Sequence, residues 1–437
     1  MPGHRREDDR IPQQRPTASD RPRRHGRDRG GAQVNHLNLN APAPLDVTKA
    51  WIHTTFKHQR QLYCCRFSPD GHHVFAGTQD GKILRWSLAS LPEPKPEEKP
   101  KANKAAKKPP EPEATVLEGH PAWVSRLVLT PDGSRLISSD LHGTLIGWDL
   151  TADPPKPAWT VKDAHPSKPG VPGWIRALAV TGDGKTLLTA GTDGIIRRWS
   201  IADGKPAGTL EAHAGDIFSL AMHPDGKTLV SGDIFGVVHQ WDLSAGKSVR
   251  QFDAAQLHSR KENFLADVGG VRSLAFDKPG KRLACGGMTD AKSNSFCPGH
   301  PGVLVFDFAS GKQTQLLRMK KGKVDDGPIT GLAFLEDGTV AGQGERLHAV
   351  CSLEFWNPDD GKVLHTIDTP SGYDLDIHPD GRRICTPIWI SNGRAGNGRH
   401  AKPEEYQPHF GHVRIYQLTE KAADKPDPKK AADKKTT

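Results

Sequence analysis

A short turn motif recurs seven times along this chain of 437 residues. Its clearest copies contain Pro-Asp-Gly, and each lies between two short apolar segments, such as IFSLAM (217–222) and TLVSG (228–232). Proline fixes the φ angle of a turn, aspartate bonds to the nearby backbone, and glycine accepts a positive φ. Strands joined by such a turn form a β-hairpin. The copies are SPDG (68–71), TPDG (130–133), TGDG (181–184), HPDG (223–226), DKPG (277–280), LEDG (335–338) and HPDG (377–380).

Two further markers accompany the turns. An aromatic residue follows each turn near the end of another apolar segment, and a histidine precedes four of them. The aromatic residues are Trp86, Trp148, Trp199, Trp241, Phe306, Trp356 and Tyr416, and the histidines are His58, His120, His165 and His213. A unit that repeats about every 42 residues predicts a repeat architecture in which each unit is one small sheet.

With these markers the chain resembles the WD40 repeat family over residues 51–418, and LEGH…TPDG…WDL (117–150) is its best single match. The resemblance implies an all-β fold, a seven-bladed antiparallel β-propeller. A lone four-stranded blade cannot bury both faces, whereas blades packed around a ring can. In this family the N-terminal strand completes the last blade, so WIHTTF (51–56) is expected to pair with VRIYQL (413–418). Deletion of residues 47–57 should then abolish cooperative unfolding.

The remaining segments are expected to be disordered tails and a loop. These are an Arg-rich tail (1–46), a Pro/Lys/Glu-rich loop (89–114) inside the propeller (47–418), and a Lys/Ala-rich tail (419–437). Most of the formal net charge of +9 lies in them, so the folded body is near neutral. The N-terminus lacks the apolar region of a secretory signal, and the chain has no run of 18 apolar residues. Six cysteines without a CxxC pair indicate a reducing compartment, so we expect a cytoplasmic protein.

WD40 blades usually contain a hydrogen-bonded set of His, Ser or Thr, Asp and Trp, with the Asp six residues before the Trp. The resemblance places such sets at His58, Asp80 and Trp86, and at His165, Asp193 and Trp199. His142 and Phe235 occupy the Asp position in blades two and four, with Asp140 and Asp233 two residues earlier. Either apolar packing replaces the network there, or these two side chains face a partner.

Long insertions are concentrated in blades five to seven, at the rim formed by blade connections and second-to-third strand loops, called the top in this family. Such loops on a rigid scaffold commonly bind partners. An Arg/His/aromatic surface suits an acidic or peptide-like partner. The candidate partner-binding residues are Arg260, Arg346, His348, Trp389, Arg394, Arg399 and His400, together with Phe235. The alternative is that these loops only cover the ring.

Catalytic and metal chemistry find little support in the sequence. Cys297 and His300, with Cys285 upstream, match no standard zinc spacing, so we expect no metal and no cofactor. There is no GxSxG, HExxH or Walker A motif. Asp374 and Asp376 share one face of a strand, as a channel-facing catalytic pair would, but solvation at a strand edge explains them more simply. RPRRHGRDRGG in the N-terminal tail lacks interleaved aromatic residues for base stacking, so nucleic acid is not the expected partner.

The resemblance therefore implies a non-catalytic scaffold for protein or peptide partners, present as a monomer or within a larger complex. Two alternatives stay open. One is a propeller enzyme acting at its channel or top face, and the other is nucleic-acid binding through the basic N-terminal tail.

Overall fold

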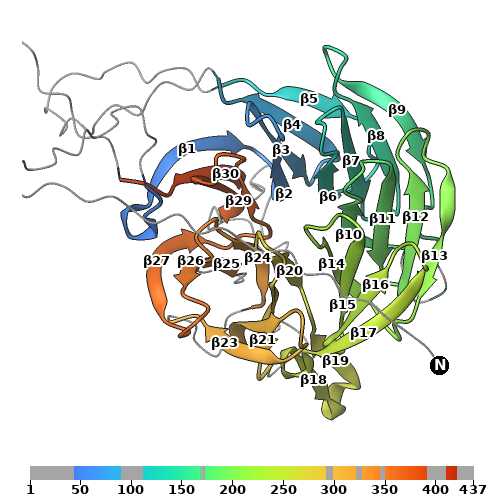
Figure 1. Ribbon diagram of the computed structural model, residues 1–437. Coiled ribbons are helices and arrows are strands. Elements are labelled where there is room, and N and C mark those ends of the chain that lie inside the picture. The colour runs from blue at the N-terminus through green and yellow to red at the C-terminus, as the bar shows by residue number, and fades with distance from the viewer. Residues whose placement is uncertain are drawn as a thin grey trace, which may run out of the picture. The chain divides into compact units, whose positions relative to one another are not determined.

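A computed structural model of the protein describes residues 44–89, 112–167, 169, 173–291, 299–320, 327–344, 350–390 and 410–420. The chain divides into two units, Met1–Pro42 and Ala43–Thr437. The first lies outside the described residues, as do most of the predicted tails and of the 89–114 loop. The second is a seven-bladed antiparallel β-propeller, as predicted (Figure 1).

Each blade is a four-stranded antiparallel sheet, and six of the seven use strands in chain order. Blade one holds β2 (Leu62–Phe67), β3 (His73–Thr78), β4 (Lys82–Ser87) and β5 (Thr115–Glu118). Blade two holds β6 (Val124–Leu129), β7 (Arg135–Asp140), β8 (Leu145–Asp149) and β9 (Lys156–Val161). Blade three holds β10 (Ile175–Val180), β11 (Thr186–Gly191), β12 (Ile195–Ser200) and β13 (Pro206–Glu211). Blade four holds β14 (Ile217–Met222), β15 (Thr228–Asp233), β16 (Val237–Asp242) and β17 (Lys247–Asp253).

Blades five to seven continue the pattern. Blade five holds β20 (Ser273–Phe276), β21 (Arg282–Thr289), β22 (His300–Asp307) and β23 (Gln313–Arg318). Blade six holds β24 (Ile329–Phe334), β25 (Val340–Gly344), β26 (Val350–Trp356) and β27 (Val363–Pro370). Blade seven holds β28 (Asp376–Ile377), β29 (Arg383–Ile390), β30 (Phe410–Gln417) and β1 (Trp51–His58). Strands β2, β6, β10, β14, β20 and β24, the first-named strands of blades one to six, lie around the centre of the ring (Figure 1).

The ring closes through β1, the outermost strand of blade seven. It pairs antiparallel with β30, from Trp51 opposite Gln417 to His58 opposite Gly411. The two strands come from opposite ends of the chain and lie side by side in Figure 1. The prediction that WIHTTF completes the last blade is confirmed.

The core lies between neighbouring blades, where apolar strand residues interlock. All seven marker aromatics lie in the third strand of their blade and are at most 6% exposed. At the contact between blades seven and one, Phe56 of β1 stacks on Trp86 of β4 with ring centroids 4.9 Å apart. Bringing the apolar faces of blades together removes them from water, which is the main stabilising contribution in a ring of small sheets.

Two carboxylates, one buried and one half-buried, also join blade seven to blade one. Asp374 Oδ2 accepts hydrogen bonds from the backbone N–H of Cys65 (3.2 Å) and from Arg66 Nη1 (2.5 Å), and Asp376 Oδ2 accepts from the N–H of Phe67 (2.8 Å). The two aspartates accept hydrogen bonds from backbone N–H groups on the edge of β2 that pairs with no strand. The interpretation that strand-edge solvation explains Asp374 and Asp376 is wrong, since both carboxylates are bonded across the blade contact.

The connection from blade four to blade five forms a small structure of its own. It contains η2 (Ala255–Leu257), η3 (Glu262–Phe264) and a hairpin of β18 (His258–Lys261) and β19 (Ala266–Gly269). The one further helix among the described residues is η1 (Val47–Lys49), which precedes β1. The described residues contain no helix long and apolar enough to cross a membrane.

Candidate functional site at the mouth of the central channel

A repeated irregularity shapes the centre of the propeller. In five blades the innermost strand carries a register shift near its start, at Tyr63, Ser125, Arg176, Phe218 and Thr330. A β-bulge inserts one residue and re-aims its side chain. All five bulged residues line one cavity of about 240 Å³.

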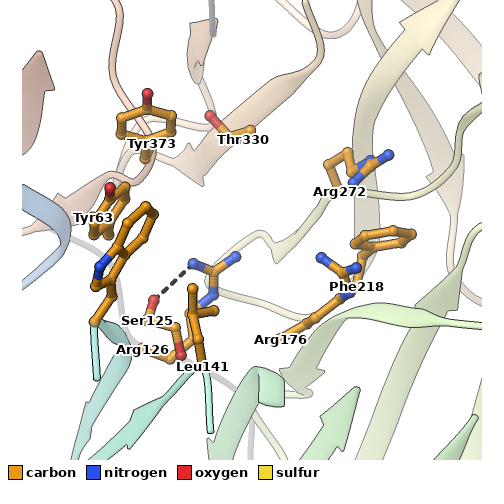
Figure 2. Close-up of a pocket in the computed structure, with 10 residues that line it drawn as sticks. Tyr63, Ser125, Arg126, Leu141, Arg176, Phe218, Arg272, Thr330 and Tyr373 are labelled. Atoms are coloured by element: carbon orange, nitrogen blue, oxygen red, sulfur yellow. Dashed lines mark hydrogen bonds between the residues drawn. The ribbon is translucent and has the colours of Figure 1, made fainter. Parts of the chain in front are cut away.

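The cavity is the mouth of the central channel, and every blade contributes to it. Arg272, directly before β20, and Tyr373, three positions before β28, complete a set of one residue per blade. Trp123, Arg126 and Leu141 line the cavity as well. Figure 2 shows these side chains around the opening. We call these ten residues the channel mouth.

Arginine side chains dominate the polar lining. Arg126, Arg176 and Arg272 line the mouth, and Arg66 lines a smaller cavity of about 110 Å³ that shares these arginines. Phe218 holds two of them together: its ring centroid lies 4.5 Å from Cζ of Arg176 and 3.7 Å from Cζ of Arg272. The negative face of an aromatic ring attracts guanidinium groups, which offsets part of their mutual repulsion.

Aromatic side chains form one wall of the mouth and extend onto the top surface. Tyr63 stacks on Trp123 with centroids 5.2 Å apart, and Tyr373 lies 5.5 Å from Tyr63. Trp123 is 42% exposed and Trp174 is 37% exposed. These two residues, with Leu141 and His142, line a neighbouring hollow of about 450 Å³, which we call the shelf. Exposed aromatics beside a polar cavity are typical of protein-binding surfaces.

The polar networks stabilise the blades under this surface. In blade three, His165 lies 3.1 Å from Asp193 and 2.8 Å from Thr189 Oγ1, which accepts from Nε1 of Trp199 at 2.9 Å. Burial would raise the pKa of Asp193, but His165 and Arg197 lower it to about 2. The structure thus brings the three predicted residues of this blade together through Thr189.

Blades two and four contain the same network with the earlier aspartates. His120 lies 3.0 Å from Asp140 and 2.6 Å from Ser138, to which Trp148 donates. His213 lies 2.8 Å from Asp233 and 2.6 Å from Ser231, to which Trp241 donates. The interpretation that apolar packing replaces the network in these blades is wrong, because Asp140 and Asp233 end the second strand and reach the histidine from there.

Blade one assembles only part of its predicted network. His58 Nε2 lies 3.8 Å from Asp80 Oδ1, and this buried nitrogen makes no hydrogen bond among the described residues. Ala76 stands where blades two to four have Ser or Thr, so no hydroxyl joins His58 to Trp86. Trp86 stacks on Phe56 instead.

Three predicted partner-binding residues fall within the described residues. Arg260 projects from the β18–β19 hairpin and pairs with Asp267 at 2.8 Å. Phe235 contacts His258 of the same hairpin edge-on, at 5.7 Å between ring centroids. Trp389 is 7% exposed. The other five, Arg346, His348, Arg394, Arg399 and His400, lie outside the described residues.

None of the partner-binding residues predicted from the sequence lines the channel mouth. The sequence feature that the bulged lining residues share is a polar or aromatic residue directly after the first apolar residue of an innermost strand. Arg176 in GWIRAL is an example. Alternation along a regular strand places that position on a blade face, and only the bulge turns it into the channel.

The chemistry of the mouth suits binding. Guanidinium groups and aromatic rings bind anions and flat or apolar groups without acting as acids or bases near neutral pH. Asp374 and Asp376, the carboxylates considered for catalysis, are bonded at the contact between blades. Burial raises the pKa of Asp376 to about 6, against the opposing charge of Arg66. Among the described residues, no group of three or more His, Cys, Asp or Glu side chains could hold a metal ion.

Comparison with known proteins places the sequence repeats in a family. The family described as "WD domain, G-beta repeat" (WD40) matches residues 51–87, 111–149, 163–200 and 204–242. Three of the four matches, 51–87, 111–149 and 204–242, begin with the outermost strand of one blade and continue through three strands of the next. This offset is the reason that a strand from the N-terminus must close the ring.

Several curated proteins resemble parts of the chain. The "66 kDa stress protein" of Physarum polycephalum is 26% identical over 183 residues, covering 41% of this chain and 26% of that protein. The "Nuclear distribution protein nudF" of Emericella nidulans is 33% identical over 98 residues, covering 22% and 20%. The "Small ribosomal subunit protein RACK1" of Saccharomyces cerevisiae is 33% identical over 90 residues, covering 20% and 27%.

The chain spans at most about half the length of the curated relatives it matches. Four matched repeats and seven blades of one topology nevertheless agree on its class. The chain contains four repeats that match the WD40 family and folds as a seven-bladed β-propeller.

Proposed function

We propose that this protein is a non-catalytic scaffold that holds protein or peptide partners on the top face of its propeller. The single observation that carries the proposal is the channel mouth, where all seven blades direct one side chain into a cavity beside exposed tryptophans. Relatives named for a ribosomal subunit and for nuclear distribution support a role in assemblies. The proposed location is the cytoplasm.

Within the described residues, the channel mouth and the shelf are the best-supported contact surface. Trp123 and Leu141 belong to both, so one extended peptide can contact the two hollows together. The top rim of blades five to seven remains a second proposed surface. Most of its candidate residues lie outside the described part of the chain, so the structure does not test them.

The two alternative functions gain no specific support. The aspartates that favoured a channel enzyme are hydrogen-bonded at the contact between blades one and seven. The basic N-terminal tail proposed for nucleic-acid binding lies outside the described residues.

Affinity capture from the native lysate tests the proposal, followed by binding of each captured protein in purified form. Four baits are compared: wild type, W123A/W174A on the shelf, a Gly/Ser replacement of residues 390–412, and V249A. Val249 is an exposed apolar residue (56%) on the outermost strand of blade four, so V249A is the control. Circular dichroism first establishes that each bait is folded.

A purified partner that binds wild type and V249A but not W123A/W174A supports the shelf and channel mouth. A partner lost only with the 390–412 replacement moves the site to blades five to seven. Binding that survives both changes would refute a top-face site. A wild-type bait with no direct partner would count against the scaffold.

A further inference from the structure

The charges around the channel mouth do not cancel. Arg66 is paired with Asp374 at 2.5 Å, and Arg176 lies 3.3 Å from Asp216. Arg126 hydrogen-bonds the carbonyl oxygen of Ser125 (Figure 2), and no carboxylate lies within ion-pair distance of it among the described residues. The channel thus concentrates positive charge between low-dielectric walls, which strengthens the attraction of an anion.

One hydrogen-bond donor of Arg176 has no partner among the described residues. Its Nε atom is buried and makes no hydrogen bond within the described part of the chain. Burial lowers the pKa of Arg176 despite its attraction to Asp216, and the charge of Arg126 lowers it further. Two neighbouring guanidiniums, one with an unpaired buried donor, form a site that a bound anion would stabilise, because a buried donor without a partner is costly.

The size and the lining of the cavity limit which kind of ligand can carry the bound anionic group. A volume of about 240 Å³ accommodates one or two side chains but not a folded element. The wall formed by Tyr63, Trp123 and Tyr373 leads onto the shelf, where Trp123 and Trp174 are exposed. A partner that fits both parts is an extended peptide with an acidic side chain beside an apolar one.

We propose that the channel mouth is an acid-specific peptide site, in which Arg126 and Arg176 bind the carboxylate of a glutamate or aspartate and the shelf holds a neighbouring apolar side chain. The inference rests on the proposed scaffold function and adds the chemistry of its ligand. A guanidinium fork binds a carboxylate through two parallel hydrogen bonds, so Arg126 and Arg176 select for charge and planar geometry together.

Selection from a displayed library of random 12-residue peptides on the full-length protein tests the inference. Wild type is compared with R126Q/R176Q, with R126K/R176K, and with K185Q/K227Q, which removes the same charge from two exposed lysines at the opposite rim. Thermal unfolding establishes that each variant is folded. The strongest wild-type peptide and its Glu→Gln or Asp→Asn analogue are then measured by fluorescence anisotropy at two salt concentrations.

The expected result is an acidic residue at one fixed position, next to an apolar residue, in the peptides selected by wild type and by K185Q/K227Q. Its neutral analogue and the R126Q/R176Q variant should each weaken binding by about 10- to 100-fold. R126K/R176K should retain part of the affinity, and higher salt should weaken the wild-type complex.

Peptides that bind wild type but show no acidic preference would overturn the inference and leave the scaffold function standing. Acidic peptides that bind R126Q/R176Q as tightly as wild type would overturn it too. If no peptide is enriched on any folded form, the acid-specific site and peptide recognition on this face are both refuted, whereas a scaffold for folded partners is still tested by the affinity capture.

Discussion

At the scale of single residues, one hydroxyl group satisfies two buried ring nitrogens in each of blades two to four. Ser138, Thr189 and Ser231 each accept from a tryptophan and lie within hydrogen-bond distance of a histidine. A buried polar network stabilises only when every member is paired. The hydroxyl is therefore the member whose loss leaves the most groups without partners.

Substitution of Ser138 by alanine should lower the free energy of unfolding by about 2 to 4 kcal/mol, because His120 and Trp148 each lose a buried partner. Urea unfolding measures the change. Ser134→Ala, in the exposed turn of the same blade, is the control and should cost less than about 0.5 kcal/mol. Equal costs for the two variants would mean that the network does not stabilise the blade.

The burial of His239 predicts that the folded protein becomes less stable in acid. Burial lowers the pKa of His239 to about 4, and neighbouring His213 lowers it too. The unfolded chain takes up a proton near pH 6.5, whereas the folded protein resists protonation until about pH 4. The free energy of unfolding should fall by up to about 3 kcal/mol as the pH falls through this window.

His239→Gln should reduce that slope, since glutamine is neutral and can still hydrogen-bond Ser248. His72→Gln, at a side chain that is 68% exposed, is the control. Urea unfolding at several pH values between 4 and 7 checks the expectation. A slope unchanged by His239→Gln would assign the acid sensitivity to other groups.

At the scale of elements, the turns, the marker aromatics and the closing strand could be predicted because each depends on local residue chemistry or on counting strands. The bulges could not, because nothing in GWIRAL distinguishes a regular strand from one whose second residue faces the channel. The networks of blades two and four were misjudged for a related reason. An Asp at the end of β7 or β15 and an Asp in the turn after β11 reach the same histidine only once the strands are folded.

Strand β1 should stabilise the ring through its inward side chains. Phe56 is 1% exposed, whereas Ile52 on the same strand is 48% exposed. Phe56→Ala should lower the free energy of unfolding by about 3 to 5 kcal/mol, and Ile52→Ala by less than about 0.5 kcal/mol. Thermal or urea unfolding separates the two. Similar small effects would show that β1 does not close the ring in solution.

At the scale of the whole molecule, closure gives every blade two neighbours. In an open row of repeats the terminal units have one uncovered face and fray first. Here the contact between blades one and seven includes β1, the Phe56–Trp86 stack and the hydrogen bonds of Asp374 and Asp376. Opening the ring at this contact should thus change how the protein unfolds as well as how stable it is.

Deletion of residues 47–57 should broaden the urea transition and separate the curves recorded by tryptophan fluorescence and far-UV circular dichroism, because uncovered blades then unfold independently. Phe252→Ala is the control: Phe252 is 1% exposed in blade four, away from the closing contact. That variant should shift the midpoint and leave one transition of unchanged slope, as expected when stability alone changes. A deletion variant that unfolds as sharply as Phe252→Ala would show that cooperativity comes from neighbouring blades alone, without the closed ring.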